Sequence, residues 1–72
     1  MDYMKWSLEY AEEAKKVLRN IEKLKKMEAT VRGDERQTLL KDIITLRGIY
    51  NELIETSGYL HKRAKELERS VA

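Results

Sequence analysis

The feature that most constrains the fold is a ladder of leucines in the second half of the chain. Leucine recurs at every seventh position, at Leu39, Leu46, Leu53, Leu60 and Leu67. The alternating positions between them are Ile43, Tyr50, Ser57, Ala64 and Val71. A heptad repeat of this kind places one stripe of a helix against another helix. We predict a helix over about residues 36–70, unbroken at Ser57 and Gly58 because the repeat continues through them without a shift.

The first half of the chain carries a second seam with the same spacing. Its positions are Tyr3, Ser7, Tyr10, Ala14, Val17, Ile21, Leu24, Glu28 and Val31. Asp2 precedes the seam, and its carboxylate can accept hydrogen bonds from the free amides of a first helical turn. These residues predict a helix over about residues 3–31.

The segment between the two seams has the residues of a very short turn, which we place over residues 32–35. Gly33 can take the left-handed conformation that ends a helix. Asp34 can cap the next helix, with Gln37 three residues later as its capping partner. A short connection makes the helices antiparallel neighbours. Residues 1–72 are therefore predicted to form a single all-α domain, an antiparallel helical hairpin.

A turn centred between residues 33 and 34 also predicts which seam residues face each other. The layers nearest the open end are Tyr3 with Ala64, Ser7 with Leu60, Tyr10 with Ser57, and Ala14 with Leu53. Each of these layers sets a small residue against a large one, which fills a core evenly. This register is the detailed expectation that a structure can test.

A second apolar stripe lies beside each seam, at heptad positions e and b. On the first helix it consists of Met4, Leu8, Ala11 and Leu18, and on the second of Leu40, Ile44 and Ile54. The e flanks of an antiparallel pair meet on the same side, so the hairpin presents one broad apolar face. Such a face normally marks an interface. We predict a homodimer in the form of a four-helix bundle, with another helical protein as the alternative partner.

Size and composition also favour a partner chain. The chain has 72 residues and no Cys, which excludes disulfides and thiolate metal sites as means of stabilising a thin core. No apolar run approaches the length of a membrane span, and the N-terminal residues lack the apolar core of a signal peptide. The absence of Cys is compatible with a reducing compartment. We expect a cytoplasmic protein with no membrane partner.

A basic stripe on the first helix supports an alternative function, the binding of RNA or DNA. Lys16, Arg19, Lys23 and Lys26 share one solvent face and are the candidate phosphate contacts. Against this alternative, the net charge is only +2 and several Glu residues lie among these cations. No aromatic residue is interleaved with them to stack on bases. A protein partner is therefore the leading interpretation.

The sequence contains no arrangement that predicts catalysis. His61 is the only His, and no Asp or Glu stands three or four residues from it to complete a metal site. There is no Cys, no glycine-rich loop and no grouping of Ser, His and Asp. We predict no catalytic residues, no metal and no cofactor.

The leucine ladder resembles a leucine zipper, but it departs from the basic-zipper pattern. Residues 25–38 are not a continuous basic helix, because the turn at Gly33 and Asp34 interrupts the helix there. The general form is similar to small helical-hairpin dimers, which is a likeness of architecture only. The leading interpretation is a non-catalytic protein–protein interaction or regulatory module. A subunit or fragment of a larger coiled-coil assembly is a further alternative.

Overall fold

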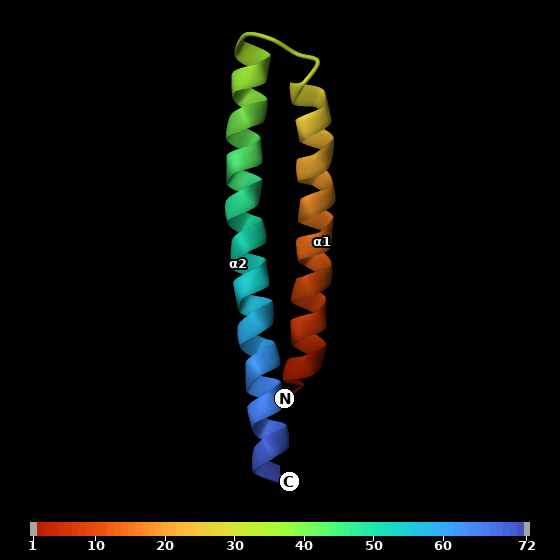
Figure 1. Cartoon of the computed structure of the whole chain (residues 1–72), viewed down its shortest axis with the longest axis vertical. Coiled ribbons are helices and arrows are strands. Elements are labelled where there is room, and N and C mark those ends of the chain that lie inside the picture. The colour runs from red at the N-terminus through yellow and green to blue at the C-terminus, as the bar shows by residue number, and fades with distance from the viewer. Residues whose placement is uncertain (1, 72) are drawn as a thin grey trace.

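The computed structural model describes residues 2–71, which form two long helices joined by a turn (Figure 1). Helix α1 covers Tyr3–Glu28 and helix α2 covers Asp34–Val71. The helices pack against each other in opposite directions, and this confirms the predicted all-α antiparallel hairpin. Helix α2 passes through Ser57 and Gly58 without a break, as the unshifted heptad phase predicts.

Helix α1 begins as predicted but ends earlier. The Oδ1 of Asp2 accepts a hydrogen bond from the backbone N–H of Lys5 at 2.9 Å, so Asp2 is the N-cap. The helix ends at Glu28 instead of near Val31. There the Met27 carbonyl accepts hydrogen bonds from the backbone N–H of Thr30 at 3.0 Å and from its hydroxyl at 2.9 Å. These two bonds satisfy a carbonyl that the end of the helix leaves free.

The connection spans residues 29–33 and is longer than predicted. Gly33 adopts the predicted left-handed conformation, with φ 71°. It lies directly before α2 instead of ending α1, and its carbonyl accepts from the N–H of Gln37 at 3.2 Å. Asp34 is the first residue of α2, where its carboxylate suits the positive end of the helix dipole.

The predicted register of the two helices is wrong by three residues. Ser7 pairs with Ser57, not with Leu60: each hydroxyl donates to the carbonyl of the other residue at 2.9 Å. The two hydroxyl oxygens are 3.3 Å apart. At the turn end the Nε of Arg36 lies 2.6 Å from Glu28 Oε1, in the same register. Small–large layering therefore did not decide the register, because a serine pair that bonds across the interface competes with it.

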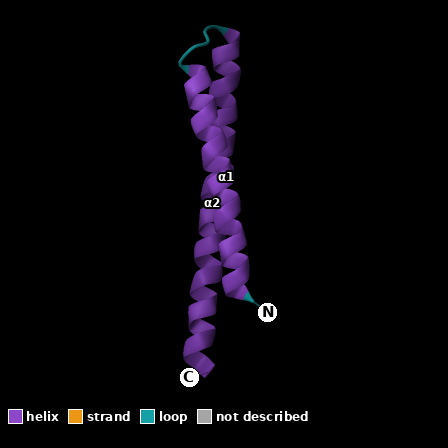
Figure 2. Ribbon diagram, turned by 90° about the vertical axis from the view of Figure 1, so that its right-hand side faces the viewer, coloured by secondary structure: helices purple, strands orange, loops and turns teal. Residues whose placement is uncertain are grey.

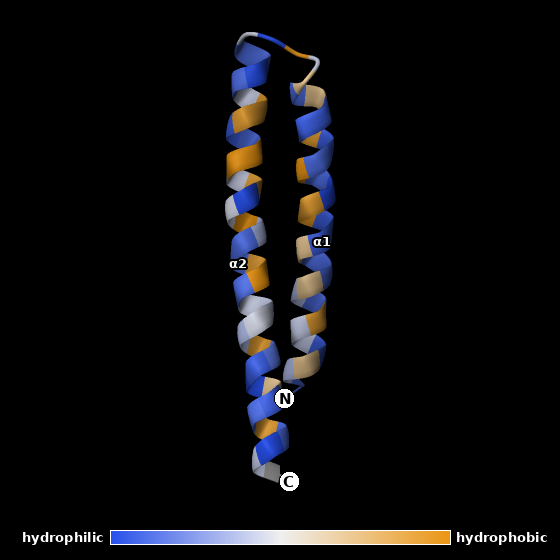
Figure 3. Ribbon diagram, in the orientation of Figure 1, coloured by the Kyte–Doolittle hydropathy of each residue, from blue (hydrophilic) through white to orange (hydrophobic). Residues whose placement is uncertain are grey.

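The core is a thin layer between the helices. The buried residues are Ser7, Ala14 and Ile21 on α1, and Ile43, Leu60 and Ala64 on α2. Apolar residues extend along both helices beyond this layer (Figure 3). Helix α2 also runs past the start of α1 (Figures 1 and 2), and Leu67, a ladder residue in that extension, is 45% exposed. One hairpin therefore leaves much of its apolar surface in water.

The glycines give a paired stability prediction. Gly48 lies within α2, and a Cβ added there would have no heavy atom within 4 Å. Gly48→Ala should therefore raise the free energy of unfolding by up to about 1 kcal/mol, since Ala is the better helix former. Gly33→Ala should lower it by about 1–2 kcal/mol, because φ 71° is costly for an L residue. Thermal melts of the two variants check the opposite signs, and equal shifts would contradict them.

Candidate self-association face

The residues of the predicted apolar stripe lie partly or largely in solvent. The exposed fraction is 70% for Ile44, 60% for Leu8, 43% for Ile54 and 39% for Leu18. Met4, Ala11 and Leu40 are half-buried. We call this set of seven residues the e/b face. Leu8 and Ile44 occupy b positions, farther round the helix from the seam, which explains why the facing helix covers them least.

The observed register determines how the e/b face is distributed along the hairpin. With Ser7 level with Ser57, the helix rise brings Ile54 level with Leu8 and Ala11, toward the open end. Ile44 lies about 3 Å along the helix axis from the level of Leu18, and Leu40 lies nearer the turn. The face therefore has two apolar clusters. Each large side chain removed from water there would contribute about 1.5–3 kcal/mol.

Polar residues separate the two clusters. Lys15, Arg47 and Asn51 occupy the e and b positions between them, and all three are exposed. The Nζ of Lys15 lies 3.2 Å from Glu12 Oε1, so its charge is partly compensated within α1. An exposed pair of this kind contributes at most about 1 kcal/mol to stability. Its effect here is to leave the middle of the face polar between two apolar ends.

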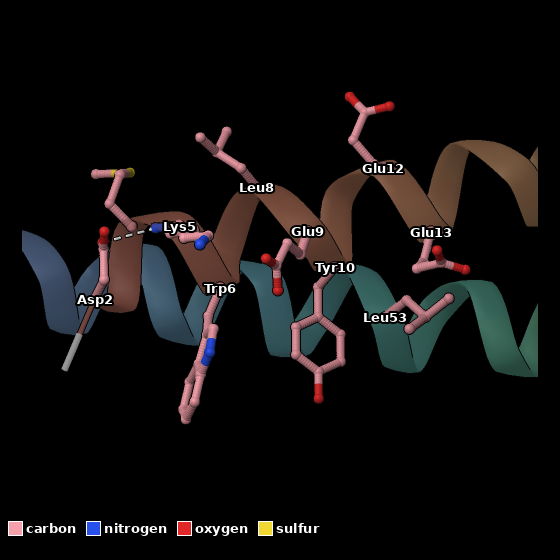
Figure 4. A pocket seen from close by; sticks show the side chains of 10 residues that line it. Asp2, Lys5, Trp6, Leu8, Glu9, Tyr10, Glu12, Glu13 and Leu53 are labelled. Atoms are coloured by element: carbon pink, nitrogen blue, oxygen red, sulfur yellow. Dashed lines mark hydrogen bonds between the residues drawn. The ribbon is translucent and has the colours of Figure 1, made fainter.

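The opposite flank of α1 carries an aromatic group that the sequence reasoning did not bring together. Trp6 is 44% exposed and meets Tyr3 edge to face, with ring centroids 6.3 Å apart and planes at 87°. Tyr10 points to the same side as Trp6, whereas Leu8 points away from them (Figure 4). Spacings of three and four residues along one helix are the signal that indicates such neighbours.

An open depression of about 1030 Å³ surrounds this part of α1 (Figure 4). Its lining residues are Asp2, Met4, Lys5, Trp6, Leu8, Glu9, Tyr10, Glu12, Glu13 and Leu53. All but Leu53 come from the N-cap Asp2 and the first turns of α1, on both of its flanks. The depression is therefore a space between projecting side chains and not an enclosed binding cavity.

The basic stripe lies in solvent, as predicted, but one of its cations is paired. The Nζ of Lys16 lies 3.1 Å from Glu13 Oε1. Arg19, Lys23 and Lys26 are exposed on the same helix. Interleaved carboxylates reduce the field that a nucleic-acid phosphate would meet.

Replacing Lys16, Arg19, Lys23 and Lys26 together with Gln should leave helix content and oligomeric state unchanged, because all four side chains are exposed. Circular dichroism and light scattering test this expectation. Any retention of the wild-type protein on RNA or DNA should fall, and its salt dependence should weaken. Retention that is undiminished in the variant would contradict a role for this stripe in such binding.

Chemistry-bearing groups elsewhere are dispersed. His61 is exposed on α2. Within residues 2–71, no three acidic or His side chains gather closely enough to hold a metal ion. Neither of the two helices described there combines the length and apolar character that crossing a membrane requires.

Fold and surface together define an all-α helical hairpin with large apolar side chains exposed along the e/b face. Comparisons with protein-family models, curated sequences and solved structures found no match to this chain.

Proposed function

We propose that the chain is a non-catalytic protein–protein interaction or regulatory module of the cytoplasm, which works as a homodimer of hairpins. The observation that carries the proposal is the exposure of the e/b face, with Ile44 70% and Leu8 60% in solvent. Exposed clusters of large apolar side chains are a typical feature of interfaces. In a chain whose core is a single thin layer, covering that surface would supply a large share of the stability.

The layout of the face supports a second copy as the partner. Its two apolar clusters lie on either side of a polar middle that contains Lys15, Arg47 and Asn51. A two-fold axis through that middle, perpendicular to the helices, brings each cluster of one copy against the other cluster of its partner. Leu8 and Ile54 would then face Leu18 and Ile44 of the second copy. The product is a four-helix bundle with an isologous interface.

Light scattering after size exclusion at micromolar concentration tests the proposal. We expect a mass of about 17 kDa, twice the 8.5 kDa of one chain, as a two-fold dimer requires. A mass of 8.5 kDa with cooperative melting would overturn the homodimer. The e/b face would then serve a different chain, as in a larger coiled-coil assembly.

A further inference from the structure

We propose that the hairpin has two registers, about half a heptad apart, and that the Ser7–Ser57 pair holds the one seen in the structure. In this register, two residues of the same heptad position face each other and exchange hydrogen bonds at 2.9 Å. In the other register, Ser7 faces Leu60 and Tyr10 faces Ser57. That second arrangement has the small–large layers that the sequence pattern favours.

Both registers keep the same two stripes in contact. Positions a and d alternate at spacings of three and four residues. A slide of half a heptad therefore replaces layers that pair a with a and d with d by layers that pair a with d, and neither helix has to rotate. The observed register sets Ile21 level with Ile43, and both are buried. The alternative sets Ile21 level with Leu46, another apolar seam residue. The slide therefore replaces one apolar layer with another.

The connection between the helices can take up the slide. Residues 29–33 lie outside both helices, although Ala29 already has helical dihedral angles, with φ −66° and ψ −18°. Continuing α1 through Ala29, Thr30 and Val31 would shorten the connection by three residues. That length equals the offset between the two registers. The slide is thus coupled to the winding of the last turn of α1.

The serine hydroxyls need not lose their hydrogen bonds in the alternative register. A helical hydroxyl can donate to a carbonyl four residues earlier, as Thr38 does to Asp34 at 3.1 Å and Thr45 to Lys41 at 3.0 Å. Ser7 and Ser57 could do the same once they separate, so no buried polar group would be left unpaired. The two registers therefore differ mainly in the reciprocal serine bonds and in the exposed Glu28–Arg36 pair.

The slide would reshape the e/b face, a consequence that rests on the proposed function. Moving α2 by half a heptad shifts Ile44 and Ile54 by about 5 Å relative to Leu8 and Leu18 on α1. A partner that fits one layout better would favour that register. The hairpin would then couple the pairing of its seam to the shape of its interaction face.

Disulfide trapping in the full chain tests for the two registers, and the absence of native Cys gives a clean background. The observed-register reporter combines Glu28→Cys with Arg36→Cys, at positions that are neighbours in the structure. The alternative-register reporter combines Glu28→Cys with Leu39→Cys, at positions that face each other after the slide. Each is equilibrated in a glutathione buffer, and the intrachain disulfide is quantified in the product of monomer mass.

Each reporter is compared with and without the pair Ser7→Ala and Ser57→Ala. With the serines intact, the observed-register reporter should close more readily than the alternative-register reporter. Removing the serines should move the ratio toward the alternative-register reporter by about tenfold, because the reciprocal bonds across the seam stabilise more than the local bonds to i−4 carbonyls that would replace them. Thr45→Ala with Ser70→Ala is the matched control, because those hydroxyls bond only within α2.

A ratio that stays within twofold when the serines are removed would overturn the proposal. The proposal would also be overturned if the control pair changed closure of the alternative-register reporter as much as the serine pair does. The disulfide ratio reports the register within one chain, whereas light scattering measures separately whether the chain dimerises. Failure of the register proposal and failure of the homodimer proposal are therefore distinguishable.

Discussion

Leu18→Glu combined with Ile44→Glu is expected to convert the proposed dimer into a monomer of 8.5 kDa. The two side chains belong to the same apolar cluster of the e/b face and are 39% and 70% exposed in the hairpin. Each substitution would remove about 1.5–3 kcal/mol of apolar burial from the interface, and each new carboxylate would have to lose its hydration on dimerisation. With two copies of each change per dimer, the dissociation constant should rise at least about a thousandfold. Sedimentation or light scattering over a concentration series measures it.

The matched control places the same charges on the opposite flank. Met27→Glu with Ile49→Glu also exchanges two partly exposed apolar residues, 51% and 41% in solvent, one from each helix. Both occupy g positions, away from the e/b face. The control should leave the mass of the dimer unchanged. If the two double variants dissociate the protein equally, the loss reflects added charge and the e/b face is not the interface.

Helix formation and the hairpin fold could be predicted from the sequence because they depend on local signals. The heptad spacing of the leucine ladder defines the packed stripe of α2. Asp2 caps α1 through its own side chain, an interaction that spans three residues. Gly33 marks the turn because the left-handed region is open to it at little cost. None of these features depends on which residues meet across the interface.

The register could not be predicted from the pattern, because both registers satisfy it. The Ser7–Ser57 pair bridges residues that are 50 positions apart in the chain. Its bonds form only where the backbones of the two helices approach closely, and a register chosen to set small residues against large ones excludes the small–small contact that permits this approach. The end of α1 was misplaced for a related reason. The bonds from Thr30 to Met27 stop the helix at a point where the heptad pattern would allow it to continue.

The candidate face was predictable from heptad position. Heptad position identifies Leu8 and Ile44 as members of a second stripe, and the structure shows them to be its most exposed residues. The edge-to-face contact of Tyr3 with Trp6 was not anticipated. The heptad pattern indicates contacts between the helices, whereas this contact arises from a spacing of three residues along one helix.

Ile21→Ala should be among the most destabilising single truncations in this chain. Ile21 is 2% exposed, and the observed register sets it level with the buried Ile43. Truncating this side chain should lower the free energy of unfolding by about 2–5 kcal/mol, because apolar burial is lost and a cavity is left behind. Because a change of 1 kcal/mol moves the melting temperature of a domain this small by about 4–8 °C, the melting temperature should fall by at least about 8 °C. Calorimetry or circular dichroism measures the change.

The comparison with Leu53→Ala makes this a test of the register in solution. Leu53 sits at the centre of the leucine ladder, yet it is only half-buried, so its truncation should cost less than that of Ile21. Ile49→Ala, at a site 41% exposed, should change stability by no more than about 0.5 kcal/mol and serves as the surface control. In the alternative register, Leu53 packs directly on Ala14 at the middle of the seam. A larger loss for Leu53→Ala than for Ile21→Ala would therefore show that the alternative register predominates.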